Sequence, residues 1–278
     1  MRVGKFDSRM ARDGEACVSA WPGRGKWRSG RVPPMWLGGM VAACLWFLAL
    51  PLWAMDAMEI LKSVDRTMHA VSCESFNRVT YELPNGNQRF VTLYTARASG
   101  RRALMVVVSP EELRGRAVLK VGDEAWLHMP GELETRKTTL LQSVVGGVFN
   151  NADFLLGDFS EEYRPTLDSE DEEHWKLTLK PLYPSTPHAS VRLTVDKKSR
   201  LPVSLTQYDA AGAALKTIQF SESRDLDGAH RAPMLLETAS GLNQAYRSSW
   251  RVGRIDEREF PDNVFTREFL PGAGRLMK

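Results

Sequence analysis

The sequence predicts an exported, mainly β protein built on one curved antiparallel sheet, with a small helical part (α+β). Apolar and polar residues alternate with a period of two through most of residues 75–252, which is typical of strands that bury one face. Turn-forming residues recur at short intervals between these stretches. A single amphipathic helix pattern precedes them. About eleven strands with short connections indicate a meander that twists and curls.

The N-terminal segment is typical of an export signal. Basic residues at positions 24, 26, 28 and 31 precede an apolar run over residues 35–53, which ends at the small residue Ala54. We therefore expect residues 1–54 to be an N-terminal extension and signal peptide, removed near Ala54. Residues 55–278 would then form one domain in the periplasm.

Two other interpretations of the leader remain open. The apolar run is long enough to cross a bilayer, so an uncleaved inner-membrane anchor is one alternative. The tetrad Val41-Ala42-Ala43-Cys44 resembles a lipobox, although ten mostly apolar residues follow Cys44 where a lipoprotein normally becomes polar.

Charge and cysteine content limit the function classes for the expected mature chain. Residues 1–54 hold eight of the 37 Lys and Arg and three of the 34 Asp and Glu, which leaves 29 basic and 31 acidic residues and a formal charge of −2. Without a basic stripe, nucleic acid is not expected as a partner. Of three cysteines only Cys73 lies beyond the leader, so no internal disulfide can form there and the packed core must supply stability.

The first two elements of the expected domain are the clearest. Residues 56–71 carry apolar side chains three or four positions apart, which predicts an amphipathic helix. A hairpin follows, because Asn85-Gly86 tolerates the positive φ of a tight turn between two alternating stretches.

Further alternating stretches complete the predicted sheet. Residues 174–180 and 190–196 alternate almost perfectly, so each should have one apolar and one polar face. The predicted strands are residues 75–83, 88–96, 101–108, 116–121, 124–129, 174–180, 190–196, 202–208, 214–221, 233–239 and 244–252. The acidic residues 168–173 are interpreted as a solvated turn between strands.

One apolar segment does not fit the meander. Residues 138–159 lack a clean period of two and contain Gly146-Gly147, and loops this long in a compact domain are usually functional. We predict a lid that closes over an apolar cavity, with the glycines as its hinge. The predicted lid residues are Leu140, Leu141, Val144, Val145, Val148 and Phe149. Truncating Val145 and Phe149 to Ala is expected to lower lipid retention without unfolding the sheet.

The sequence offers no catalytic constellation, so an enzyme is not expected. The five histidines are scattered, none at the helical spacing of a metal pair, and neither a metal nor a cofactor is expected. No nucleophile elbow, phosphate loop or dinucleotide fingerprint is present. Cys73 is interpreted as a small buried residue rather than a nucleophile.

An ordered set of motifs lies between Ser109 and Tyr163. It comprises Ser109-Pro110, Gly115, Gly122-Asp123-x-x-Trp126-Leu127-x-x-Pro130, Arg136, Asn151-Ala152-Asp153-Phe154 and Asp158-Phe159-x-x-x-Tyr163. This set resembles the LolA-like outer membrane lipoprotein-sorting proteins. Residues 197–202 and Asp262-x-Val264-Phe265 continue it more loosely. The family's usual Gly-Ser-Asp-Phe is replaced here by Asn-Ala-Asp-Phe at residues 151–154.

The resemblance implies a half-open barrel of about eleven strands, with helices covering its concave face and an apolar cavity between them. It implies a periplasmic carrier that binds lipoprotein acyl chains or another lipid and delivers them towards the outer membrane, with an inner-membrane export complex as partner. Two alternatives stay open: a regulatory sensor of the same fold that binds lipoprotein and a membrane-anchored protein, and an enzyme on a β scaffold.

Physical reasoning supports a cavity independently of the resemblance. A curved sheet presents more apolar surface than one short helix can cover, and exposed apolar surface is unfavourable by about 25 cal/mol per Å². The alternation predicts which side chains share an apolar face, but not which face is concave. The predicted cavity wall is Tyr81, Leu93, Leu127, Trp175, Leu177, Leu179, Val191, Leu193 and Val195.

Overall fold

The computed structural model describes residues 55–69, 72–83, 85–226, 228, 230–241 and 246–277. The predicted signal, the end of the first predicted helix and the start of the last predicted strand therefore lie outside the described residues. Within these ranges, no helix combines the length and the apolar character needed to cross a membrane.

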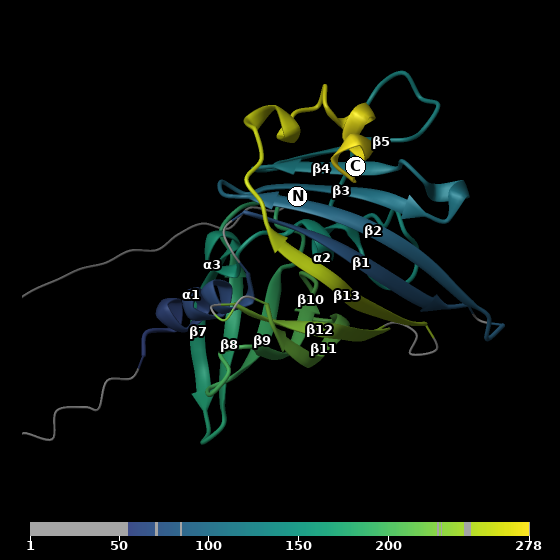
Figure 1. Cartoon of the computed structure of the whole chain (residues 1–278). Coiled ribbons are helices and arrows are strands. Elements are labelled where there is room, and N and C mark those ends of the chain that lie inside the picture. The colour runs from purple at the N-terminus through teal and green to yellow at the C-terminus, as the bar shows by residue number, and fades with distance from the viewer. Residues whose placement is uncertain are drawn as a thin grey trace, which may run out of the picture. The chain divides into compact units, whose positions relative to one another are not determined.

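The described chain is an open, curved antiparallel sheet with short helices on one face (Figure 1). The helices are α1 (Ala57–Met68), α2 (Asn151–Leu155) and α3 (Phe159–Glu162), with 3-10 turns η1 (Glu111–Leu113), η2 (Asp262–Phe265) and η3 (Leu270–Met277). The strands are β1 (Cys73–Glu82), β2 (Gln88–Ala98), β3 (Arg102–Ser109), β4 (Ala117–Val121), β5 (Glu124–His128), β6 (Arg136–Lys137), β7 (Tyr163–Glu170), β8 (His174–Pro181), β9 (Ser190–Asp196), β10 (Pro202–Tyr208), β11 (Ala214–Asp225), β12 (Arg231–Ser240) and β13 (Arg247–Glu257).

The fold class is as predicted, but the sheet has thirteen strands among the described residues rather than about eleven. The two additional strands are β6, which is only two residues long, and β7. Residues 168–170 of the acidic segment, predicted to lie in a turn, are the end of β7. Pro165 argues against a strand in the sequence, because proline has no N–H to donate to a ladder. β7 is an edge strand, however, where a missing N–H is tolerated.

The sheet consists of two meanders joined in its middle. One runs from β1 to the edge strand β6, and the other runs from the opposite edge strand β7 back to β13, which pairs with β1. The chain must therefore pass from one edge to the other between β6 and β7. It does so through residues 138–162, hereafter the crossing segment, which includes α2 and α3.

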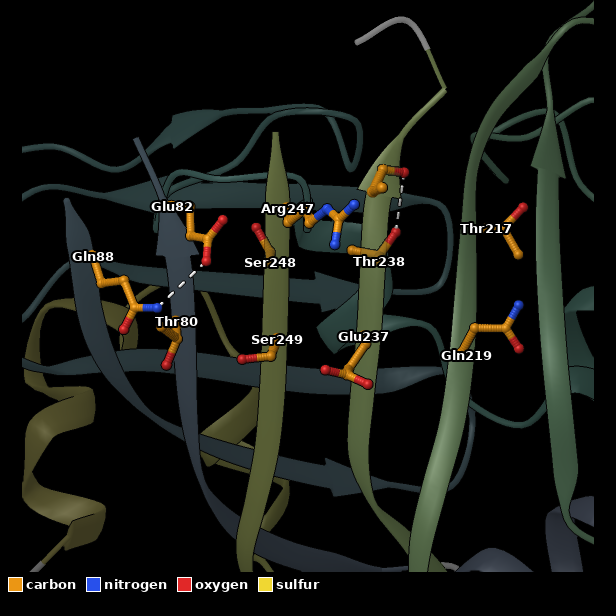
Figure 2. A pocket seen from close by; sticks show the side chains of 11 residues that line it. Thr80, Glu82, Gln88, Thr217, Gln219, Glu237, Thr238, Arg247, Ser248 and Ser249 are labelled. Carbon is orange, nitrogen blue, oxygen red and sulfur yellow. Dashed lines mark hydrogen bonds between the residues drawn. The ribbon is translucent and has the colours of Figure 1, made fainter. Parts of the chain in front are cut away.

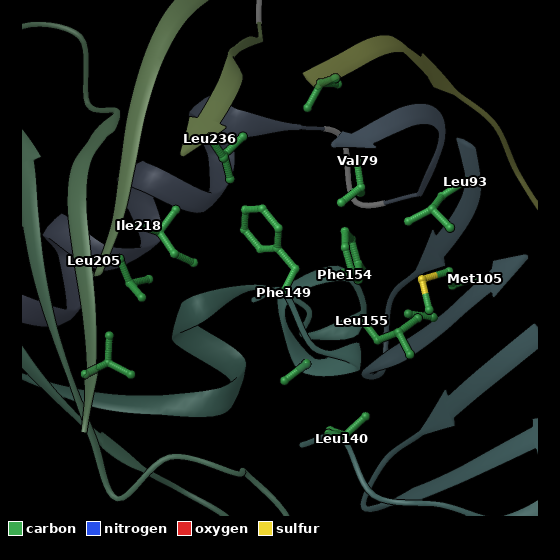
Figure 3. Close-up of a cluster of buried hydrophobic side chains, with 14 of the residues drawn as sticks. Val79, Leu93, Met105, Leu140, Phe149, Phe154, Leu155, Leu205, Ile218 and Leu236 are labelled. Carbon is green, nitrogen blue, oxygen red and sulfur yellow. The ribbon is translucent and has the colours of Figure 1, made fainter. Parts of the chain in front are cut away.

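The main core lies between the sheet and the crossing segment. Figure 3 shows Phe149 and Phe154 of that segment between Leu205, Ile218 and Leu236 on one side and Val79, Leu93 and Met105 on the other. We call the sheet face that they cover the inner face. Helix α1 contacts β7 and β12, while α2 contacts β2, β3 and β4. The helices therefore cover the concave face, as the resemblance implied.

A second, smaller core lies on the outer face. The 3-10 turns η2 and η3 pack Val264, Phe265 and Leu270 against Tyr94 and Leu104 of β2 and β3. This covering explains why β3 is apolar on both faces, with Ala103 to Val107 all buried.

Candidate lipid-binding cavity

Two adjoining hollows lie under α1 and the crossing segment, in the middle of the inner face. Their volumes are about 100 Å³ and 110 Å³. They share the lining residues Met68, His69, Arg97, Phe220, Leu236 and Trp250, so we treat them as one central cavity. Most of its lining surface is apolar. The predicted hollow exists, but the protein's own side chains fill most of the space beneath the helices.

A chain of hydrogen bonds joins four polar side chains of the cavity wall. Trp250 Nε1 donates to Asn77 Oδ1 at 2.9 Å, and Asn77 Nδ2 donates to Ser75 Oγ at 2.8 Å. Ser75 Oγ in turn lies 2.6 Å from Thr95 Oγ1. Because buried polar groups are costly only when unpaired, this chain makes the wall compatible with an apolar occupant.

Arg97 marks one side of the cavity, where three elements meet. Its guanidinium donates to the carbonyl oxygen of Leu156, after α2, at 3.0 Å. It also lies 2.7 Å from Nε2 of His69, which follows α1. A guanidinium has only donors, so Nε2 of His69 accepts this bond and the ring hydrogen is on Nδ1. Arg97 on β2 thus ties α1 and the crossing segment to the sheet.

A carboxyl group beside this tie anchors α3. Asp65 of α1 is buried and accepts hydrogen bonds from the backbone N–H groups of Phe159 and Ser160, at 2.8 and 2.9 Å. Burial raises the pKa of Asp65 from 3.8 to about 6, against the lowering effect of these hydrogen bonds. Burial also raises the pKa of the neighbouring Asp158.

A buried ion pair also holds the crossing segment to the sheet. Asp153 of α2 pairs with Lys216 of β11, and their side chains are 2% and 4% exposed. Lys216 also donates to the carbonyl oxygen of Val148 at 3.2 Å. Asn150 and Asp153 form a capping box that starts α2. The predicted hinge glycines are packed closely against the sheet, because a Cβ on Gly147 would lie only 2.6 Å from Oγ of Ser248 on β13.

The structure brings most of the predicted lid residues into the core. Leu140, Val144, Val145 and Phe149 are buried there, Val148 is half-buried, and Leu141 is 53% exposed. Phe149 is 0% exposed and packs against Phe154 and Trp250, with ring centroids 5.9 Å away in both cases. Movement of this segment remains a prediction. A Phe149→Ala change alone should cost about 3–5 kcal/mol, so the truncation variant proposed from the sequence would be destabilised as well.

The predicted wall residues share the inner face, but most lie beside the central cavity. Eight of them are buried, and Tyr81 packs against the same core from a half-buried position. Only Val191 of the nine lines the cavity. The others fill the core to either side of it, and their contact with a ligand remains a prediction.

Sequence reasoning missed the residues that do line the cavity, because β1 and β13 come from opposite ends of the chain. The signal was the run of small or polar side chains at the inward positions of β1: Cys73, Ser75 and Asn77. Such residues leave space where a core would carry larger ones. Cys73 is buried as predicted, and burial raises the pKa of its thiol.

A larger hollow of about 550 Å³ lies on the outer face (Figure 2). Its lining side chains include Thr80, Gln88, Gln219 and Glu237, and Gln88 donates to Glu82 at 3.4 Å. Hydroxyl, amide and carboxylate groups suit water or polar ligands, not acyl chains. The central cavity is therefore the candidate site. Among the described residues, no group of three or more His, Cys, Asp or Glu could hold a metal ion.

A family model described only as an uncharacterised protein matches residues 99–271, more than half of the chain. The chain belongs to this family. No curated protein matches it significantly in sequence.

Solved structures establish the fold. A LolA superfamily protein from Nitrosomonas europaea superposes with a TM-score of 0.71 and 22% identity, covering 78% of this chain and 100% of the other. A putative outer membrane lipoprotein-sorting protein domain from Vibrio parahaemolyticus gives 0.66 and 17%, with 77% and 98% covered. A DUF1329 family protein from Desulfovibrio piger gives 0.67 and 16%, with 77% and 97% covered. The LolA-like resemblance expected from residues 109–163 is thus confirmed at the level of fold.

Proposed function

We propose that this protein is a periplasmic, non-enzymatic carrier that binds an acyl chain of a lipoprotein or another lipid in the central cavity. The observation that carries the proposal is the chain of hydrogen bonds in the cavity wall that runs from Trp250 through Asn77 and Ser75 to Thr95. An occupant that offers no hydrogen bonds leaves none of these groups unpaired. Each buried methylene would contribute roughly 0.8 kcal/mol.

Binding requires the cavity to widen. Its two hollows, about 100 and 110 Å³, are smaller than the roughly 300–1,000 Å³ that is usual for ligand sites. The crossing segment and α1 are the elements to move, since they cover the cavity, and the bonds of Arg97 to Leu156 and His69 are the ties beside it that would open. Ten methylenes would supply about 8 kcal/mol, enough to break several such ties at about 1–3 kcal/mol each.

The wider role follows from the fold and the leader. We propose that export removes the leader near Ala54 and that the carrier receives its cargo from an inner-membrane export complex. It would then release the cargo towards the outer membrane. Transfer would be passive, from one apolar site to another of higher affinity.

A charge placed in the cavity wall tests the proposal. Ile255 is half-buried and lines the cavity, whereas Leu133 is 100% exposed in the β5–β6 connection. We expect Ile255→Glu to lower the affinity for palmitate at least tenfold in a fluorescence displacement titration, and Leu133→Glu to leave it unchanged. Equal affinities in the two variants, or no palmitate binding by the wild type, would remove the basis for the proposal.

A further inference from the structure

The sheet is split on one side of the central cavity, between β12 and β13. These strands pair only from Leu235 to Ala239, opposite Arg251 to Arg247. Their other neighbours stay paired much further, since β12 pairs with β11 from Arg231 and β13 pairs with β1 as far as Glu257. Residues 231–234 of β12 and 252–257 of β13 therefore have no ladder between them, and we call the place between these two stretches the slot. The pairing at residues 235–239 closes the far end of this slot.

Irregularities in three neighbouring strands accompany the split. Glu222 of β11 has a φ of +53°, which is unusual for a residue other than glycine, and it is left out of the register with β12. Pro233 of β12 has no N–H to donate. Gly253 of β13 is a bulge residue without a partner in β1, and a Cβ there would approach the Phe76 carbonyl oxygen to 3.1 Å. The slot is therefore built into the backbone.

Two arginines bridge β11 and β13 beside the slot. Arg224 of β11 donates to the carbonyl oxygen of Gly253 at 3.1 Å. Arg251 of β13 pairs with Glu222 of β11 at 2.5 Å, with both side chains about half exposed. These bonds link the strands on either side of β12 in place of the missing ladder.

The inside of the slot is apolar and belongs to the central cavity. Ala232, Pro233 and Leu236 line it from β12. Val252 and Ile255 line it from β13. Cys73 lies on the neighbouring strand β1 and lines the same hollow, 8% exposed.

These features favour a polymethylene chain over an added peptide strand. A peptide strand needs backbone partners on the facing strands, but Pro233 has no N–H and the Gly253 carbonyl already accepts from Arg224. A methylene chain needs only apolar contact, which the lining of the slot provides. We infer that the slot between β12 and β13 is the binding and entry site of one unbranched acyl chain. This inference rests on the proposed function and adds the route and the chain's position.

Cys73 provides the reporter, because modification of its thiol can be read at that residue by peptide mass spectrometry. We expect palmitate to slow its reaction with N-ethylmaleimide at least tenfold in the full-length protein.

Two pairs of variants test the slot itself. Ala232→Phe fills the slot and should weaken palmitate binding at least tenfold. The matched Ala239→Phe, at the paired end of the same strand, should not. Arg224→Ala removes one bridge and should speed Cys73 modification in the lipid-free protein several-fold, whereas Arg78→Ala on the outer face of β1 should not.

The outcomes distinguish a failure of the slot inference from a failure of the proposed function. If the wild type binds no palmitate, the proposed function fails and the slot with it. If palmitate binds but neither protects Cys73 nor distinguishes Ala232→Phe from Ala239→Phe, the acyl chain lies elsewhere and only the slot is refuted. Protection of Cys73 by an unacylated Ser-Ser-Asn-Ala peptide would also overturn the inference, in favour of strand addition.

Discussion

Removing the ammonium group of Lys216 tests how the crossing segment is held. Lys216→Met keeps most of the side-chain volume but leaves the Asp153 carboxylate, 2% exposed, without its counter-charge. Loss of one partner of a buried pair typically costs about 3–5 kcal/mol. Asp153 retains hydrogen bonds from Gln207 Nε2 at 3.0 Å and the Asn150 N–H at 2.7 Å. These bonds put the expected loss near the lower limit, about 3 kcal/mol.

Urea denaturation gives the global loss, and hydrogen exchange over residues 138–156 shows whether the crossing segment opens first. A loss of about 3 kcal/mol in a domain of this size corresponds to a Tm lower by roughly 6–12 °C. The matched control is Lys62→Met, since Lys62 pairs with Glu59 at 3.3 Å but both side chains are about half exposed. Such exposed pairs contribute about 0–1 kcal/mol. If Lys216→Met costs no more than Lys62→Met, or exchange in residues 138–156 is unchanged, the buried pair does not hold the segment.

Two further predictions concern buried carboxyl groups. The pKa of Asp65 is raised from 3.8 to about 6, so the native state binds this proton more tightly than the unfolded chain does. The stability that this group contributes is therefore greatest below about pH 4 and is lost as the pH rises through 6. Compared with Asp65→Asn, the wild type should therefore lose about 2 kcal/mol of unfolding free energy between pH 4 and pH 7. Parallel pH profiles from urea melts would contradict this. The second prediction concerns Glu162, which accepts a hydrogen bond from Lys120 at 2.7 Å. Lys120 is 1% exposed, so Glu162→Gln leaves a buried ammonium group without a full counter-charge. We expect a loss of about 3–5 kcal/mol in the same melts, and a loss below about 1 kcal/mol would refute the role of this pair.

The fold was largely predictable because alternation is a local signal. The hairpin around Asn85-Gly86 and the two regular strands at residues 174–180 and 190–196 are present as β1–β2, β8 and β9. The strand β7 was missed because Pro165 and its acidic end are typical of turns. Only its place at the edge of the sheet, which depends on the whole topology, makes them compatible with a strand.

The site was less predictable, because it depends on pairing between distant parts of the chain. Leu177 and Leu193 share the inner face as predicted, but they pack into the core beside the cavity and do not line it. The cavity lies where β1 meets β13, and no local pattern joins Cys73 to Val252. The lost periodicity of the crossing segment shows from the sequence that it is not a strand. Why it differs, namely that it passes between opposite edges of the sheet, follows only from the strand order.

The proposed function requires an acyl chain to occupy the cavity on the inner face. Photo-crosslinking with a palmitate analogue that carries a diazirine at its chain end can locate that chain. We expect adducts on lining residues such as Phe220, Leu236 and Trp250, and we expect unlabelled palmitate to compete them away. Adducts confined to the outer-face hollow around Gln219 and Glu237, or none that palmitate competes away, would contradict it.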